Sequence, residues 1–310
     1  MRVVRSLERA RGLVRRSVVT IGNFDGVHRG HQVILKQLRR DADARGTSAV
    51  VLTFDPHPVS IVRPDAAPKS LMTLGDRLAT LAGEGVDLAV VQRFSQGFAS
   101  IEAGDFVRRF LVEILDADKI LVGHDLNFGR GRGGSVETLV AAGSVHGFAV
   151  EVVGPVDVDG VVVHSSVIRR LVAAGDVAAA ERLLGRPHLV RGRVRPGAGR
   201  GRGLGFATAN LKPTTPLVPG DGVYATVARL GAARIDSVTS IGSTPTFGGS
   251  ETVIEAHLFA DLDELYGKAL ALEFVAKIRD QRRFDSPAAL VEQIGRDVAT
   301  ARQVLADRAR

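Results

Sequence analysis

One change of pattern near Gly185-Arg186-Pro187 divides the sequence. Before this point, β-rich runs alternate with helical runs, which is typical of βαβ units around a parallel sheet. Beyond it, runs rich in Val, Thr and Ile follow one another with only Gly and Pro between them, which indicates an antiparallel β structure. The 310 residues also exceed what one hydrophobic core usually organises. The sequence therefore predicts two domains, residues 1–185 and 186–310.

The first domain is predicted as a Rossmann-like α/β fold. Strands are expected at 18–22, 48–54, 88–94, 120–123 and 148–153, and helices at 31–44, 74–82, 105–115, 135–143, 166–174 and 177–184. Ligands of such sheets bind beyond the carboxyl ends of the strands. Segments 22–31 and 124–134 both follow a strand, so we expect them on one rim of the sheet.

The second domain is predicted as a small antiparallel β-barrel with a closing helix. Strands are expected at 189–194, 223–230, 235–241, 252–259 and 269–278. The last helix has Ser286 as its N-cap and Pro287 at its first position. The fold class is therefore α/β plus β.

Composition excludes several classes of protein. Hydrophobic residues at 45% and charged residues at 24% are ordinary for a globular chain. No window holds the roughly 18 uncharged apolar residues of a membrane span, and the first residues lack the apolar run of a secretory signal. Without cysteine there is no disulfide, thiolate nucleophile or Cys-ligated metal. We expect a cytoplasmic protein with no membrane partner.

The net charge of +7 raises the question of a nucleic-acid partner. Its one concentrated patch is 186–202, with six arginines. Aromatic platforms for stacking bases are scarce, since the chain has no Trp and two Tyr. Small phosphorylated ligands explain the arginines equally well, so no nucleic-acid partner is expected. The sequence leaves a homo-oligomer open.

The segment 22–31, GNFDGVHRGH, is the strongest candidate site. It joins a strand to a helix, whose N-terminal amides and dipole favour an anion. His28 and His31 share one face of the first turn and can donate to phosphate oxygens. Two other interpretations stay open: a metal pair, for which no third ligand lies nearby in sequence, and a glycine turn with two surface histidines.

Five segments in order carry a family resemblance. The string TIGNFDGVHRGH at 20–31 resembles the nucleotidylyltransferase superfamily and, within it, the FMN adenylyltransferase module of bacterial bifunctional riboflavin kinase/FAD synthetases. LTFDPHP at 52–58, GHDLNFG at 123–129, SSVIR at 165–169 and GRGLGFATAN at 201–210 resemble further motifs of that family. The similarity spans nearly the whole chain.

The resemblance implies that the first domain joins FMN to ATP, giving FAD and pyrophosphate. The phosphate of FMN is already ionised, so this step needs alignment and charge neutralisation rather than a base. The implied ATP and phosphate ligands are Gly22, Phe24, Asp25, His28, His31, Asp125, Ser165, Ser166 and Arg169, with His28, His31 and Arg169 catalytic. By itself Arg169 would be a solvated helix arginine. His57 is expected at the flavin rim or as a turn residue.

The second domain is implied to phosphorylate riboflavin with ATP, giving FMN and ADP. The attacking alcohol must lose a proton, so a carboxylate base is useful. The resemblance makes Glu255 that base, although a Glu on a half-buried strand is more often salt-bridged. Thr208 and Asn210 face one way on an extended segment and can offer two oxygens to Mg²⁺, the expected cofactor. Gly201, Gly205 and Arg279 are implied to complete the ATP and flavin site.

Two departures from the family pattern stand out. Ala207 takes the place of the signature proline, which loosens the turn before Thr208. Ser166 takes the place of a threonine and keeps the hydroxyl.

Three rival functions remain open at this point. Only one of the two modules could be active, with the kinase the weaker. A nucleotidylyltransferase could act on another phosphorylated acceptor. An RNA-binding protein could use the patch at 186–202.

Overall fold

The computed structural model describes the chain except for residues 198–205, 247–248, 261–264 and 309–310, and for the side chains of 244–251. The Cα atoms form two compact units, Met1–Ser70 with Leu74–His164, and Leu71–Thr73 with Ser165–Arg310. The first unit ends before the predicted domain boundary, so two helices expected in the first domain cluster with the second unit. The boundary at 185 stays a prediction.

The first unit is built on a six-stranded sheet in which every pair is parallel. Its strands are β1 (Arg2–Val4), β2 (Ser17–Ile21), β3 (Ser48–Asp55), β4 (Leu88–Arg93), β5 (Ala117–Gly123) and β6 (Ala149–Val153), in the order β1-β4-β3-β2-β5-β6. The predicted parallel α/β fold is confirmed. Strand β2 is buried along its whole length, as expected for the centre of a sheet covered on both faces.

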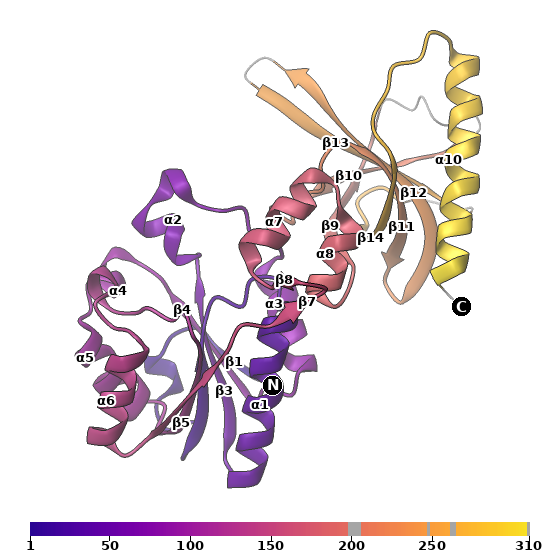
Figure 1. Cartoon of the computed structure of the whole chain (residues 1–310). Helices are drawn as coiled ribbons and strands as arrows, with labels where there is room; N and C mark the ends of the chain where they lie inside the picture. Colours follow the sequence, from indigo (N-terminus) through magenta and orange to yellow (C-terminus); the bar gives the residue numbers. More distant parts are fainter. Residues whose placement is uncertain (198–205, 247–248, 261–264, 309–310) are drawn as a thin grey trace. The chain divides into compact units, whose positions relative to one another are not determined.

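Helices cover both faces of this sheet. They are α1 (Arg29–Arg45), α2 (Pro58–Val62), α3 (Leu74–Gly83), α4 (Gln96–Ala99), α5 (Ala103–Phe106) and α6 (Val136–His146), with 3₁₀ turns η1 (Glu8–Ala10), η2 (Pro64–Ala66) and η4 (Arg130–Arg132). A small ribbon, β7 (Asp157–Val158) with β8 (Val161–Val162), follows. Figure 1 shows α1 and α3 on one side of the sheet and α5 and α6 on the other.

The strand order reverses between β2 and β5. The chain runs from β2 through α1 to β3 in one direction, and from β5 through α6 to β6 in the other. The carboxyl ends of β2 and β5 therefore flank the topological switch point, where open α/β sheets bind ligands. The two loops expected on one rim, 22–31 and 124–134, start from these strand ends.

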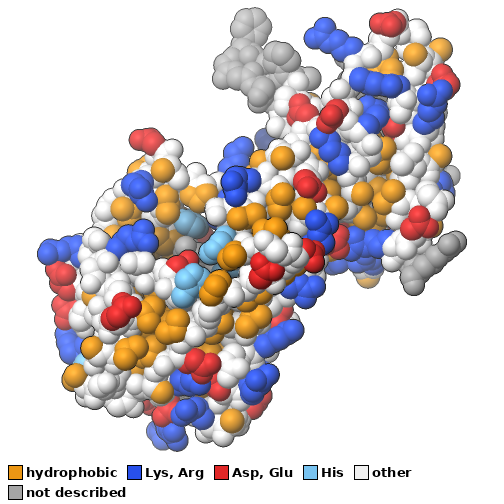
Figure 2. Space-filling model, viewed as in Figure 1, with side chains coloured by type: hydrophobic (Ala, Val, Ile, Leu, Met, Phe, Trp, Pro, Cys, Tyr) orange, Lys and Arg blue, Asp and Glu red, His pale blue; other side chains and the backbone are white. Residues whose placement is uncertain are grey.

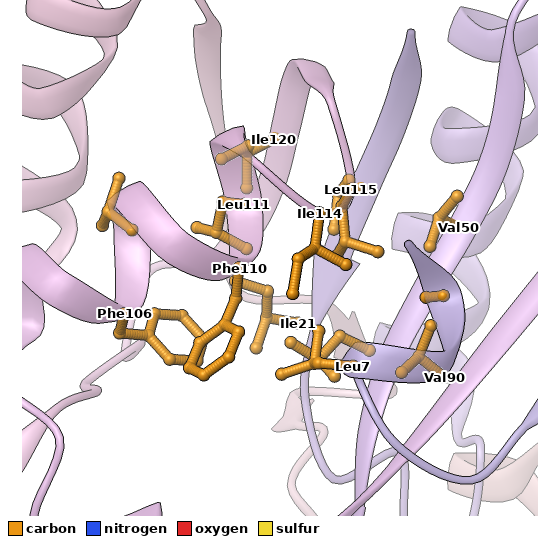
Figure 3. Close-up of a cluster of buried hydrophobic side chains, with 14 of the residues drawn as sticks. Leu7, Ile21, Val50, Val90, Phe106, Phe110, Leu111, Ile114, Leu115 and Ile120 are labelled. Carbon is orange, nitrogen blue, oxygen red and sulfur yellow. The ribbon is translucent and has the colours of Figure 1, made fainter. Parts of the chain in front are cut away.

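One predicted helix is changed in form. Instead of a single α-helix over 105–115, α5 leads into a π-helical stretch, η3 (Val107–Val112). Hydrogen bonds from Glu113 N to Arg108 O and from Leu115 N to Phe110 O span five residues. Figure 3 shows Phe106, Phe110, Leu111, Ile114 and Leu115 grouped with side chains of the sheet, and all are buried. The π-helical stretch thus lies within the hydrophobic core of the first unit.

The second unit opens with α7 (Ser165–Ala174) and α8 (Val177–Leu184), and α8 contacts strands β9 and β14. A closed barrel follows, in the order β10-β13-β12-β11-β14-β9. Its strands are β9 (His188–Arg195), β10 (Ala209–Pro213), β11 (Gly222–Leu230), β12 (Ala233–Thr246), β13 (Gly249–Leu258) and β14 (Ala269–Arg279). Every pair is antiparallel, so the predicted barrel is confirmed.

The barrel has a mainly apolar interior and a partly covered exterior. Tyr224 and Phe274 pack in the interior, with ring centroids 5.3 Å apart. The closing helix α10 (Pro287–Arg308) covers part of the outside through Ala301 and Leu305. Ser286 caps it as predicted, since the Ala289 amide donates to the Ser286 hydroxyl at 3.2 Å.

Candidate functional site

The first candidate site is the turn from β2 into α1. His28 is the N-cap of α1, and its Nδ1 accepts a hydrogen bond from the His31 amide at 3.4 Å. A ring nitrogen that accepts carries no proton, so the neutral His28 ring holds its proton on Nε2. Nε2 is then a donor at the positive end of a helix, which suits an anionic oxygen.

The two histidines of this turn stack on one another. The ring centroids of His28 and His31 are 3.7 Å apart at an angle of 14°, and Phe24 packs against His31 at 4.9 Å. Gly30 leaves the space for His28, since a Cβ there would lie 3.3 Å from the ring. Figure 2 shows histidine side chains gathered in one area of the molecular face. The pair is thus held as a unit at the helix terminus.

The same turn carries backbone strain. Phe24 and Val27 have φ values of 49° and 37°, in the left-handed region that side chains rarely adopt, and Gly26 lies at 86°. Phe24 and Val27 are fully buried and anchor the turn. Such strain persists only where the surroundings impose it, and it concentrates at functional sites.

A buried arginine, Arg77, connects to this turn through hydrogen bonds. The Nη1 atom of Arg77 on α3 donates to the Phe54 carbonyl at 3.0 Å and to the Thr53 hydroxyl at 3.3 Å. The Thr53 hydroxyl in turn donates to the Asn23 carbonyl at 3.1 Å. Burial lowers the pKa of the Arg77 guanidinium, and the nearby carboxylates of Asp25 and Asp55 oppose that effect. Arg77 therefore ties the ends of β2 and β3 together.

His57 lies beside the same turn. It is the N-cap of α2, where its Nδ1 accepts from the Val59 amide at 3.2 Å. Its Nε2 approaches the Asn23 side-chain amide within 3.4 Å. The segment expected at the rim thus touches the loop that holds His28, while its role toward flavin stays a prediction.

The loop after β5 presents Asp125. Its carboxylate is exposed, and Gly123 gives it room, since a Cβ there would lie 3.1 Å from Asp125 Oδ1. A backbone pair between Phe128 and Gly134 closes the loop. This fixed loop at the carboxyl end of β5 places Asp125 on the rim beside the switch point.

The SSVIR segment, residues 165–169, begins α7. Ser165 and Ser166 lie in its first turn and Arg169 in the next, within the second compact unit. Gly22, Phe24 and Asp25 lie with His28 and His31 in the β2–α1 turn of the first unit.

The second candidate site is a row of side chains across the barrel. In strand order, Asn210 pairs with Glu255, Glu255 with Ser240, Ser240 with Val223, and Val223 with Arg279. Directly paired residues point to the same face of a sheet. Val223 packs against α10 on the outside, whereas Ile254 and Ala256, the neighbours of Glu255, pack inside. The row therefore lies on the outer face, and it unites three predicted site residues.

Thr208 lies just before β10 and is half-buried. The backbone of Gly197 crosses close to Asn210, because a Cβ on Gly197 would stand only 2.1 Å from the Asn210 amide nitrogen. Any other residue at 197 would displace Asn210. Two further predicted residues, Gly201 and Gly205, lie outside the described residues.

Arg279 makes a contact that the motif did not predict. Its Nε and Nη2 donate to the two carboxylate oxygens of Asp297 on α10. Its guanidinium carbon also lies 5.8 Å from the centre of the Phe284 ring. The side chain fastens α10 to the end of the row, and direct contact with flavin stays a prediction.

Sequence reasoning did not single out Arg77 or Asp297. A signal was present for both, since each is a charged residue on the apolar face of its helix. Arg77 shares its face with the buried Leu81, and Asp297 shares its face with Ala301. Charged residues in such positions are rarely buried without a partner.

Among the described residues, no group of three or more His, Cys, Asp or Glu side chains could hold a metal ion. The described helices also include none long and apolar enough to cross a membrane.

Comparisons with known proteins agree for both halves of the chain. A family model described as FAD synthetase matches residues 11–167, and one described as riboflavin kinase matches residues 184–305. The two matches follow the order of the two candidate sites.

Curated relatives match over nearly their whole length. "Bifunctional riboflavin kinase/FMN adenylyltransferase" of Pseudomonas fluorescens is 41% identical over 307 residues, covering 99% of this chain and 98% of the relative. The protein of that name in Bacillus subtilis is 34% identical, covering 91% and 90%. A crystal structure from Streptococcus pneumoniae, described as a macrolide-efflux protein, has a TM-score of 0.88 at 30% identity and covers 97% and 98%.

Proposed function

Because the chain belongs to the family of bifunctional riboflavin kinases/FMN adenylyltransferases, we propose which of its residues carry the two reactions. Its C-terminal part is the riboflavin kinase, which makes FMN and ADP from riboflavin and ATP. Its N-terminal part is the FMN adenylyltransferase, which makes FAD and pyrophosphate from FMN and ATP. The division at residue 185 is part of the proposal, supported by family matches that end at 167 and begin at 184.

The pairing of Asn210 with Glu255 in the barrel is the observation that carries the kinase assignment. In this proposal the Glu255 carboxylate accepts the proton of the primary alcohol of riboflavin. The alcohol oxygen then bonds to the γ-phosphorus of ATP as the bond to ADP breaks. A positioned general base contributes about 10²- to 10⁴-fold in rate. Glu255 suits this role because it is half-buried on the outer face, away from the apolar interior.

Thr208 and Asn210 would hold a Mg²⁺ ion in the kinase site. A hydroxyl and an amide oxygen, both uncharged, fit an ion that keeps several waters and takes its other ligands from ATP phosphates. The lack of a larger ligand cluster among the described residues is compatible with such a site. When bound, the ion would neutralise phosphate charge, while Asn210 and Thr208 orient it beside Glu255.

The adenylyltransferase step needs no base, since the attacking phosphate of FMN is already ionised. That oxygen bonds to the α-phosphorus of ATP, and pyrophosphate leaves. The Nε2 proton of His28, the His31 ring and the N-terminus of α1 support a role in neutralising the charge that develops on the phosphate oxygens. Arg169, Ser165 and Ser166 are assigned to the same ATP phosphates by their motif, and Asp125 to the nucleotide.

Gly22, Phe24 and Asp25 complete the phosphate turn in this proposal, and His57 borders the flavin. Gly201, Gly205 and Arg279 are assigned to the ATP and flavin site of the kinase by motif similarity.

One incubation tests the two activities together. The chain is mixed with riboflavin, ATP and Mg²⁺, and the flavins are resolved by chromatography over time. FMN that rises and then gives way to FAD is the expected result. FMN alone would restrict activity to the barrel. FAD from added FMN, without turnover of riboflavin, would mean that the altered signature at Ala207 has disabled the kinase. Inertness toward all flavins would overturn the proposal.

A further inference from the structure

His257 follows Glu255 on the same outer face of β13, and no role has yet been assigned to it. Its Nδ1 lies 2.9 Å from the carbonyl oxygen of Ala207, a contact that joins positions 50 residues apart. A carbonyl oxygen only accepts, so Nδ1 must carry the proton and donate. The His257 side chain on β13 thereby holds the backbone of the segment that precedes β10.

The ring of His257 is fixed by aromatic neighbours. Phe206 meets it edge to face with centroids 5.4 Å apart, and Phe259 does the same at 5.8 Å. Arg302 of α10 lies over the ring of Phe259, 4.5 Å from its centre. The ring of His257 thus packs against Phe206, which precedes Ala207, and against Phe259, which follows β13. This packing limits the directions in which Nδ1 can donate.

The position of this contact explains its importance. The ladder between β10 and β13 runs through the pairs Asn210 with Glu255 and Ala209 with Ala256, and β10 begins at Ala209. Thr208 would be the next residue of the ladder, opposite His257, but it lies outside the strand. The hydrogen bond from His257 to Ala207 therefore connects the two segments just beyond the last backbone pair of the ladder.

We propose that His257 is a positioning residue of the kinase, which holds Thr208 in place for the bound metal ion through the carbonyl of Ala207. The inference rests on the proposed function, since it assumes that Thr208 is a metal ligand. Alanine at 207 makes the contact necessary, because its backbone has the freedom that a proline would remove. A side chain distant in sequence supplies the restraint instead.

Three variants test the role. His257→Leu keeps the apolar bulk and removes the donor. His257→Asn keeps an amide N–H that can take the place of Nδ1–H. The double variant His257→Leu/Ala207→Pro replaces the hydrogen bond by a stiffer backbone. FAD formation from supplied FMN, by the other site of the same chain, is the control for each.

The first measurement is the Mg²⁺ concentration that gives half-maximal FMN formation. His257→Leu should raise it about fivefold, the worth of one hydrogen bond, while His257→Asn and the double variant stay within about twofold of the unsubstituted chain. FAD formation should be the same in all. An unchanged Mg²⁺ curve in His257→Leu, or equal losses in His257→Leu and His257→Asn, would overturn the inference alone.

The second measurement does not depend on turnover. Proton–nitrogen correlation spectra of the ring nitrogens identify the tautomer of each of the eight histidines, and the signals that vanish in His257→Asn belong to His257. A proton on Nδ1 is expected, and a neutral ring with its proton on Nε2 would contradict the contact. If the unsubstituted chain made no FMN at any Mg²⁺ concentration, the proposed function would be overturned and this inference with it.

Discussion

Arg279 of β14 and Asp297 of α10 form a two-pronged ion pair in which both carboxylate oxygens accept hydrogen bonds. Nε donates at 2.9 and 3.1 Å and Nη2 at 2.7 Å. Asp297 is 3% exposed, and Gln293 also donates to it at 2.7 Å. The pair fastens the closing helix to the barrel at the end of the row that holds Asn210 and Glu255.

Replacing Asp297 by alanine should therefore destabilise the second unit. Removing one partner of a buried pair leaves the other charge without compensation, which costs about 3–5 kcal/mol. Denaturant unfolding followed on the second unit measures the loss, and FMN formation should fall with it. Asp307→Ala, in an exposed contact with Gln303 on the same helix, is the control. Equal unfolding free energies for the two variants would contradict the argument.

Glu255→Gln should abolish FMN formation and spare FAD formation from supplied FMN. Glutamine keeps the size and the strand pairing of the side chain but cannot accept the proton. A loss of about 10²- to 10⁴-fold in the kinase rate is expected. The two activities are measured separately on one preparation. If both fell together, misfolding or a wrong assignment would be the explanation.

His31→Ala should stop FAD formation and let FMN accumulate from riboflavin. The change removes one of the two stacked rings at the start of α1 and leaves the barrel intact. Chromatography of a riboflavin incubation shows the accumulation directly. His146→Ala, at the exposed end of α6, is the matched control. Normal FAD output from His31→Ala would exclude the phosphate role given to His31.

Arg77→Met should also act on FAD formation alone. Methionine retains much of the volume but leaves the Phe54 carbonyl and the Thr53 hydroxyl without their shared donor. The ends of β2 and β3 then lose their brace, and we expect at least a tenfold slower adenylylation, which one or two lost hydrogen bonds suffice to give. Initial rates with supplied FMN measure it, and unchanged rates in a folded variant would show that Arg77 has no positioning role.

The free energy of unfolding should fall at alkaline pH because Tyr224 is buried. Burial raises the pKa of its phenol, and Asp221 and Asp280 add to the effect. The phenol of the unfolded chain ionises first, near pH 10, so the stabilisation is complete below that pH and is lost as the pH rises above it. Unfolding free energies measured between pH 9 and 11 should fall more steeply for the unsubstituted chain than for Tyr224→Phe. Tyr266→Phe changes an exposed residue and should keep the steep slope.

The contiguous parts of both sites could be predicted from the sequence. The turn from β2 into α1 depends on neighbouring residues, since glycines, a capping histidine and an apolar strand all lie within one short segment. Glu255 was expected on a half-buried strand, and it lies half-buried on β13. For the same local reason, the cap at Ser286 was predicted correctly.

Partners from distant segments could not be predicted in this way. Alternation gives the face of a strand but not its register, so nothing in one strand alone reveals that Glu255 pairs with both Asn210 and Ser240. Strand β10 was not predicted, because it is short and contains Lys and Pro, which interrupt the apolar pattern of a strand. The brace of Arg77 and the contact of His257 with Ala207 depend on how separate elements come together.

Side chains alternate between the two faces of β13, so substitutions at successive residues should have two different effects. Ile254, Ala256 and Leu258 point into the barrel, and Glu255 and His257 point out of it. In a saturation library of residues 254–258, substitutions at 254, 256 and 258 should reduce the yield of folded protein, whereas those at 255 and 257 should leave the yield intact and reduce FMN output. The two phenotypes would then alternate residue by residue, because the side chains that stabilise the barrel and the side chains that serve its chemistry lie on opposite faces of one strand.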